Sequence, residues 1–235
     1  MTTYTAPPNQ NNLVLNNGDT LNVDASGQAF NTMNNGGVEN VYSGGTDSGA
    51  TINSGGGSNG LEYVYGNATD TTINSGLEFV VSGGTATHIT INSGSALWVA
   101  GVAVDTTINS GGLEQILGDG LSSVVTFGGP NAILFVAGEP SALIGTISNW
   151  QVGDRIEFDA TLTGVSQSGN TLTVTWGDNQ TATYTLVGQQ PNTEVKLQNN
   201  DLILQQQLSV GSAPPVNNIA ELNAALQRYL EPLVG

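Results

Sequence analysis

Short runs of β-branched and aromatic residues, each closed by glycine, recur along the first 140 residues of the chain. The pentapeptide Thr-Ile-Asn-Ser-Gly begins at Thr51, Thr72, Thr90 and Thr107, so successive copies are separated by 21, 18 and 17 residues. A looser run that also ends in glycine lies between the copies, as in the segment from Val41 to Gly45. A self-similar period of this length is the sequence signature of a stacked repeat architecture.

These runs predict short strands and tight turns, because they are rich in Val, Ile, Thr and Tyr and are bounded by Gly, Asn and Ser. A single period has too few apolar side chains to bury, whereas stacked periods pair their strand edges and share one core. The pattern therefore predicts an all-β fold, a parallel β-solenoid (β-helix) of about seven rungs. The isoleucines of the pentapeptides should stack inside it, and the asparagines that follow them suit a ladder of side-chain amides. These isoleucines are Ile52, Ile73, Ile91 and Ile108.

A glutamate precedes the apolar residue of the second run by two positions in several periods. Strict alternation along a strand would place both side chains on the same face. An unpaired carboxylate in a core is very costly. We therefore expect a corner or bulge between the two positions that turns the glutamate out of the core. The pairs are Glu39 and Val41, Glu62 and Val64, Glu78 and Val80, and Glu114 and Ile116.

The change in composition after residue 140 predicts three parts. Residues 1–140 form the repeat β-solenoid, residues 141–207 a β-rich capping module, and residues 208–235 a linker followed by a short amphipathic helix. In the capping module, alternating patterns predict one hairpin over residues 171–186 and another over residues 196–204. Its role would be to cover the last rung, whose open edge invites aggregation.

Two segments are candidates for self-association. The first apolar run, Leu13, Val14 and Leu15, could pair with an open strand edge of another copy. The predicted C-terminal helix has an apolar stripe, which could dock on its own β-module, contact a neighbouring subunit or serve secretion. The stripe includes Ile219, Leu222, Leu226 and Tyr229.

Charge narrows the range of partners. The formal net charge is −16, and residues 1–154 contain twelve carboxylates but no Lys or Arg. Such a surface repels phosphate polymers, which excludes nucleic acid as a favourable partner. Cysteine is absent, so neither a disulfide nor a thiolate metal site can form. The sequence has no apolar run of 18 residues and no visible signal peptide, so we expect no transmembrane segment.

The sequence offers little for catalysis, and we expect no enzyme activity and no cofactor. Polysaccharide-cleaving β-helices need acids beside Arg or Lys, and the repeat region has neither cation. In register, Asp70, His88 and Asp105 would form a column, which is either a metal ladder or a solvated polar edge. Oxygen-rich turns and the acidic surface make weak calcium binding possible, although no calcium-binding nonapeptide is matched.

Tyr63, Phe79 and Trp98 each precede the valine of their rung and predict a vertical aromatic stripe. If the stripe points inward it is part of the core. If it points outward it could stack on sugar rings or on another subunit.

The alternation of Thr-Ile-Asn-Ser-Gly with Val-Tyr-Ser-Gly-Gly over roughly residues 12–140 resembles the repeats of AIDA-type autotransporter adhesins. The segment with Gly-Thr-Ile, Trp150 and Gly-Asp-Arg-Ile is similar to a C-terminal module of surface proteins exported by type I secretion. The chain departs from an autotransporter in being short and lacking a translocator domain.

The resemblance implies a secreted or cell-surface protein of a Gram-negative bacterium. It implies a structural or adhesive role, with self-association into a filament, layer or biofilm matrix. The alternative is a polysaccharide-binding module or an adhesin that recognises host or matrix glycans.

Overall fold

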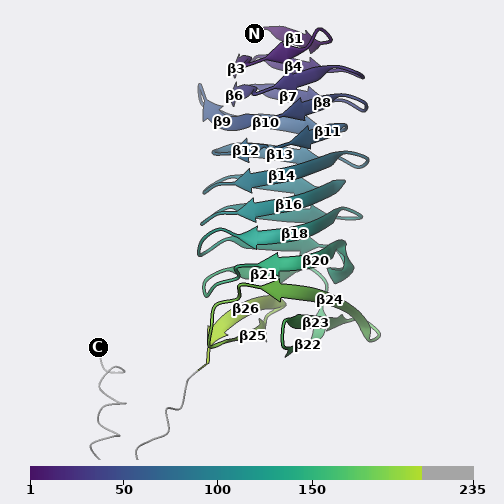
Figure 1. Ribbon diagram of the computed structural model, residues 1–235, viewed down its shortest axis with the longest axis vertical. Helices are drawn as coiled ribbons and strands as arrows, with labels where there is room; N and C mark the ends of the chain where they lie inside the picture. The colour runs from purple at the N-terminus through teal and green to yellow at the C-terminus, as the bar shows by residue number, and fades with distance from the viewer. Residues whose placement is uncertain (208–235) are drawn as a thin grey trace, which may run out of the picture.

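The computed structural model describes residues 1–207, which form a tall stack of short strands with the N-terminus at one end (Figure 1). The predicted all-β parallel solenoid is confirmed, with about eight turns. Within residues 1–207 the only helical element is one turn of 3-10 helix over Pro140–Ala142. The predicted C-terminal helix, including its apolar stripe, lies outside the described residues.

One side of the stack is sheet A, to which every turn contributes one strand, all pairing in parallel. The register places like on like, because Glu62 lies between Glu39 and Glu78, and Val64 between Val41 and Val80. The strands are β1 (Thr3–Ala6), β4 (Thr20–Val23), β7 (Val38–Val41), β10 (Ser58–Val64), β13 (Gly76–Val80), β15 (Ala96–Val99), β17 (Leu113–Leu117), β19 (Ile133–Ala137) and β21 (Arg155–Phe158).

The other side is sheet B, which bends once in each turn. In the early turns a short strand lies on each side of the bend, in the pairs β2 (Gln10–Asn11) and β3 (Val14–Asn16), β5 (Gln28–Phe30) and β6 (Met33–Asn35), β8 (Thr46–Ser48) and β9 (Thr51–Gly55), and β11 (Asn67–Thr69) and β12 (Thr72–Ile73). Later turns have one continuous strand, in the order β14 (Thr85–Ile91), β16 (Val102–Ile108), β18 (Leu121–Phe127) and β20 (Leu143–Ser148).

The bend of sheet B is made by one residue with a positive φ in each turn from β2 to β18. These corner residues lie above one another and have φ between 52° and 80°. Asparagine, aspartate and glycine accept this left-handed conformation most readily, because their side chains are short or absent. The corner residues are Asn12, Asn31, Gly49, Asp70, His88, Asp105 and Val124.

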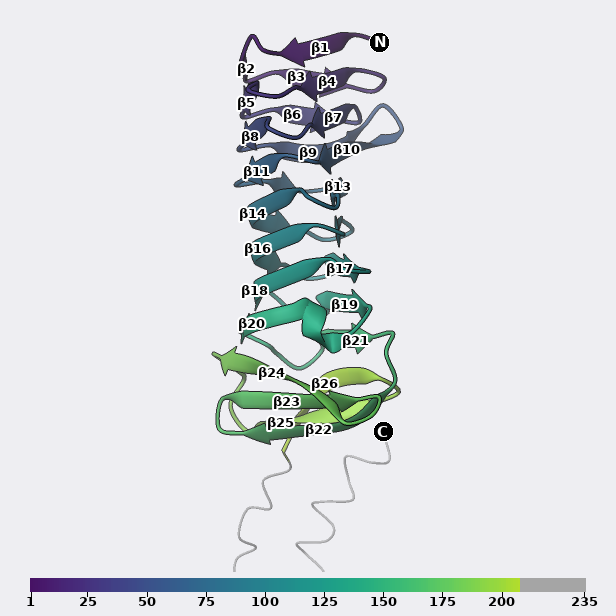
Figure 2. The same cartoon turned by 90° about the vertical axis from the view of Figure 1, so that its right-hand side faces the viewer.

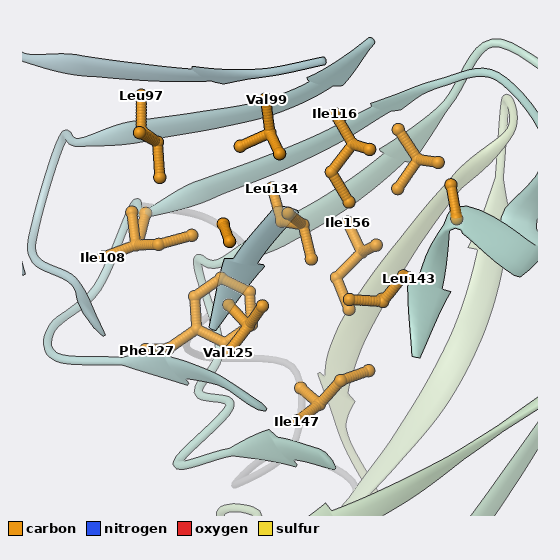
Figure 3. Packing of buried hydrophobic residues seen from close by; sticks show 14 of the residues in the cluster. Leu97, Val99, Ile108, Ile116, Val125, Phe127, Leu134, Leu143, Ile147 and Ile156 are labelled. Carbon is orange, nitrogen blue, oxygen red and sulfur yellow. The ribbon is translucent and has the colours of Figure 1, made fainter. Parts of the chain in front are cut away.

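The aliphatic column predicted from the pentapeptides is confirmed. Ile52, Ile73, Ile91 and Ile108 are register partners and are completely buried. The column continues into Phe127, whose ring stacks on Trp150 at 6.4 Å between centroids. Figure 3 shows Ile108 and Phe127 facing the apolar side chains of sheet A, such as Leu97, Val99 and Leu134.

The predicted amide ladder is also confirmed. The Nδ2 of Asn53 donates to Oδ1 of Asn35 at 3.0 Å, and each asparagine below repeats the bond to the one above. Asn74 donates to Asn53 at 3.0 Å, Asn92 to Asn74 at 2.8 Å, and Asn109 to Asn92 at 2.7 Å. Each amide therefore links two turns along the edge of sheet B.

The expected corner or bulge beside the glutamates is wrong. Glu39, Glu62, Glu78 and Glu114 are 0–1% exposed and lie on the same inner face as the valine or isoleucine two residues later. The strands keep strict alternation because sheet A pairs continuously through both positions. The solenoid interior therefore contains acid side chains, which the sequence argument had placed outside.

Parallel stacking continues past residue 140, through β20 and β21, before antiparallel strands cover the end of the stack. The end strands are β22 (Leu162–Ser168), β23 (Thr171–Trp176), β24 (Gln180–Val187), β25 (Thr193–Gln198) and β26 (Asp201–Gln206). The two predicted hairpins are confirmed as β23–β24 and β25–β26. Strand β24 pairs with β20 and β26 with β21, so both sheets of the last turn receive a partner.

One loop departs from the outline of the stack. Strands β9 and β10 meet in a short antiparallel hairpin, with Gly55 opposite Ser58, that projects beyond the neighbouring turns (Figure 2). Gly56 and Gly57 form its tip with φ of 59° and 87°. The Nδ2 of Asn17 donates to the carbonyl of Gly56 at 2.9 Å and holds the hairpin against the first turns.

Candidate functional site: the outer face of sheet A

The outer face of sheet A carries two parallel columns of side chains that are largely apolar. Inner positions such as Val64 alternate with outer positions such as Leu61 and Tyr63, which are partly exposed. From β7 to β19 no outward position in these strands carries a charge. The first column is Val38, Leu61, Leu77, Ala96, Leu113 and Ile133, and the second is Asn40, Tyr63, Phe79, Trp98, Gln115 and Phe135.

The predicted aromatic stripe lies in the second column and faces outward, so the inward alternative is excluded. The ring centroids of Tyr63 and Phe79 are 6.2 Å apart, and those of Phe79 and Trp98 are 6.1 Å apart. Interplanar angles of 59° and 80° give edge-to-face contacts, an arrangement that aromatic pairs favour. Trp98 is the most accessible of the three, with 38% of its surface exposed.

A second aromatic feature of this face was not predicted from the sequence. Tyr42 and Tyr65 stack with centroids 5.8 Å apart and planes at 22°, and they are 40% and 38% exposed. They follow the last residues of β7 and β10, at the margin of the same face. The signal was present in the Val-Tyr-Ser-Gly-Gly and Val-Tyr-Gly runs, where a tyrosine precedes a turn glycine.

Together, these rings and aliphatic side chains form what we call the aromatic face: Leu61, Tyr63, Leu77, Phe79 and Trp98, with Tyr42 and Tyr65 at its margin. Such a face offers stacking and van der Waals contact with an apolar surface of similar spacing. Hydrogen bonding is available from the tyrosine hydroxyls and the indole N–H. A pyranose ring presents a matching combination, since its C–H face is apolar and its hydroxyls lie around the rim.

The column of Asp70, His88 and Asp105 is present as predicted. Nδ1 of His88 lies 3.4 Å from Oδ1 of Asp70, and Nε2 lies 3.5 Å from Oδ2 of Asp105. All three side chains are exposed and occupy corner positions of sheet B. Within residues 1–207 no group of three His, Asp or Glu side chains is arranged to hold a metal ion. The imidazole therefore bridges two carboxylates on the surface, and a protonated ring can donate to both.

The N-terminal candidate segment divides between core and surface. Leu15 is completely buried, Leu13 packs partly against it, and Val14 is 44% exposed. Strand β3, which begins at Val14, pairs with β6 and, within residues 1–207, with no second strand. Its backbone edge is therefore open in the first turn. The helical candidates from Ile219 to Tyr229 lie outside the described residues.

The interior acids form a second unusual feature. Desolvation raises the pKa of Glu39 and of Glu62 well above the ordinary range, and nearby carboxyls add to both shifts. Burial, followed by the charge of Asp47, raises the pKa of Glu78 to about 8. Burial raises the pKa of Asp47 to about 7. Burial also raises the pKa of Glu114, although its Oε2 accepts a 2.6 Å hydrogen bond from Thr106.

Comparison with protein-family models and with curated proteins gives no match. Among solved structures, the chain is similar to a fragment of TibA that is hyper-glycosylated by TibC, with a TM-score of 0.55 and 27% sequence identity. The likeness covers 65% of this chain and 55% of that fragment, so the chain spans little more than half of its length. No helix among residues 1–207 is long and apolar enough to cross a membrane.

Proposed function

We propose that this protein is a non-catalytic adhesive protein of the bacterial cell surface that binds neutral glycan chains through the aromatic face. The observation on which this rests is the uncharged outer surface of sheet A, with Trp98, Tyr42 and Tyr65 exposed on a chain of net charge −16. Leaving apolar surface in contact with water is unfavourable. A contiguous apolar patch that stays exposed therefore marks an interaction site in many soluble proteins.

Neutral glycans fit this face better than charged polymers do. Acidic polysaccharides and nucleic acids are repelled by a chain whose formal net charge is −16, whereas a neutral sugar adds no charge. Consecutive rungs repeat the contact at the strand spacing of about 4.8 Å. Several weak sugar contacts along one chain then sum to a useful affinity by multivalency.

The resemblance of the repeats to AIDA-type adhesins, and the likeness to the TibA fragment, support an adhesive role and a secreted or cell-surface location. Export from a Gram-negative bacterium by type I secretion belongs to the same proposal, as does a place in a biofilm matrix. In this proposal neither calcium nor another cofactor takes part in binding.

The test is binding of purified protein to a glycan array and to insoluble neutral polysaccharides. Trp98→Ala and Tyr65→Ala should each weaken binding about fivefold, because each removes one stacking ring worth about 1 kcal/mol. The matched control is Leu121→Ala, an exposed apolar side chain on sheet B that should leave binding unchanged. Equal binding by all four proteins would contradict the proposal.

Self-association into a filament or layer is the second candidate, and the open edge of β3 favours it. Strand edges recruit further strands through backbone hydrogen bonds, without any need for a complementary surface. The two functions are compatible, since one uses a face of the stack and the other uses its end.

A further inference from the structure

Four carboxyl groups share the interior of the turns between β7 and β13. Glu39, Glu62 and Glu78 are register partners on consecutive strands of sheet A, and Asp47 enters from β8 in sheet B. Each is at most 1% exposed. We call these side chains the acid column.

The groups that face the acid column are neutral. Sheet A contributes Leu21 above and Leu97 below, and sheet B contributes the alanines in register with Asp47. The hydroxyl of Thr32 donates to Oε1 of Glu39 at 3.3 Å. Thr71, seven residues before Glu78 in the sequence, is also buried. No Lys, Arg or His is buried within residues 1–207. The alanines are Ala29, Ala68 and Ala86.

Five oxygens of the three glutamates accept no hydrogen bond: Glu39 Oε2 and both oxygens of Glu62 and of Glu78. The oxygens of Asp47 accept none of good geometry, although the nearby backbone N–H groups of Ser48 and Ala50 oppose the rise of its pKa. An ionised carboxylate without a partner costs several kcal/mol or more to bury, and four in one interior would also repel each other. A neutral acid costs far less, and its O–H can donate to a neighbouring carboxyl or hydroxyl. No arrangement of these side chains suits a metal ion.

We propose that the acid column is a proton-binding site: its four carboxyl groups hold protons in the folded protein up to near-neutral pH, and their ionisation loosens these turns as pH rises. Each group that ionises releases one proton to water and leaves one charge in the interior. Burial raises the pKa values of all four groups above their ordinary range, and repulsion from neighbouring carboxyls adds to the shifts of the three glutamates.

The repeat itself supports this assignment in two turns. Thr32 donates to Glu39 and Thr106 donates to Glu114, whereas Ile89 is in register with Thr106 in the turn where Leu97 replaces the glutamate. Glu62 has no such threonine, because Ala50 is in register with Thr71, and the hydroxyl of Thr71 makes no hydrogen bond. A hydroxyl therefore accompanies the buried acid at Glu39 and at Glu114.

The stability change has a definite sign. Unfolded carboxyls have a pKa of about 4.3, and the folded groups have raised values, so folding favours the protonated form. The stabilisation is complete below pH about 4 and is lost as pH rises toward the folded values, about 7 for Asp47 and about 8 for Glu78. Most soluble proteins behave in the opposite way over the acidic part of this range, because their carboxylates are paired.

The experiment compares the full chain with Glu62→Gln/Glu78→Gln, which keeps the shape and cannot ionise. The melting temperature of the wild type should fall by about 5–10 °C between pH 5 and pH 9. The fall in melting temperature should be clearly smaller in the double variant. Asp119→Asn removes an exposed acid and should reproduce the wild-type curve.

A second measurement on the wild type alone does not depend on the variants folding. Infrared spectra of the wild type at pH 7 should contain the C=O band of protonated carboxylic acid, which should weaken as the pH is raised to 9. Absence of that band at pH 7 would overturn the proposal. So would stoichiometric calcium in the purified protein whose removal by chelator lowers the melting temperature, because the acids would then be cation ligands.

Discussion

At the scale of single residues, the left-handed corner of sheet B decides which side chains fit. Asn31, Asp105 and their equivalents meet it with short polar side chains, but Val124 has φ 58° at the same place. A β-branched residue rarely adopts this conformation, because its Cβ substituents crowd the backbone. The corner therefore stores strain in one turn that its neighbours avoid.

Replacing Val124 by Asn should stabilise the protein by about 1 kcal/mol, since such strain costs about 1–3 kcal/mol and Val124 is exposed, so little packing is lost. Denaturant unfolding followed by circular dichroism measures the change. Val104→Asn is the matched control, because Val104 lies in the extended part of β16 and gains nothing from asparagine. If Val124→Asn unfolds at lower denaturant than the wild type, the corner is not strained.

The same corner explains what sequence spacing could and could not say about Asp70, His88 and Asp105. The period predicted correctly that they stack in register. Their shared feature, however, is a backbone φ between 56° and 59°, which no pattern of hydrophobic and polar positions reveals. A column of ionisable groups can therefore arise from a backbone requirement for short or polar side chains at a bend.

At the scale of strands, the period-two alternation predicted the inner and outer faces better than the assumption that charged residues stay outside. Alternation alone places Glu114 beside Ile116 in the interior, as observed. The expected bulge came from the cost of a buried charge, and that cost is far smaller for a neutral carboxyl that is bonded to Thr106 at 2.6 Å.

This pairing predicts a strong coupling between the two side chains. Thr106→Ile alone should destabilise the protein by about 1–3 kcal/mol, because it leaves the buried Glu114 without its donor. Thr106→Ile with Glu114→Leu recreates the Ile89 and Leu97 combination found one turn earlier, so it should restore stability to the wild-type value or above. A double-mutant cycle from denaturant unfolding measures the coupling, and additive effects would show that the pair does not interact.

At the scale of the whole molecule, the two ends of the stack differ. Both sheets of the last turn receive partners from β24 and β26, whereas β1 and β3 in the first turn each pair on one side only within residues 1–207. The repeats predicted the stack and the composition shift predicted strands beyond it. The way those strands cap the end depends on long-range pairing that the local pattern does not contain.

If copies associate end to end, Val14→Pro should lower the association constant at least about tenfold. Proline has no backbone N–H, so the edge of β3 could no longer pair fully with a strand of another copy. Sedimentation velocity over a range of concentrations measures the size distribution. The control is Met33→Ala, which trims an exposed side chain in the next turn and leaves the backbone edge intact. Identical distributions for wild type and Val14→Pro would exclude assembly through this edge.

The β9–β10 hairpin has a consequence for how the chain can change. Turns above and below it are joined by backbone pairing that runs through the flanking strands, and no atom lies within 4 Å of where a side chain on Gly57 would begin. Extra residues between Gly56 and Gly57 would extend into solvent without shifting the register of the stack. That tip is accordingly a place where evolution or an engineer could graft a foreign loop, so that the rod becomes a carrier for a recognition sequence of any origin.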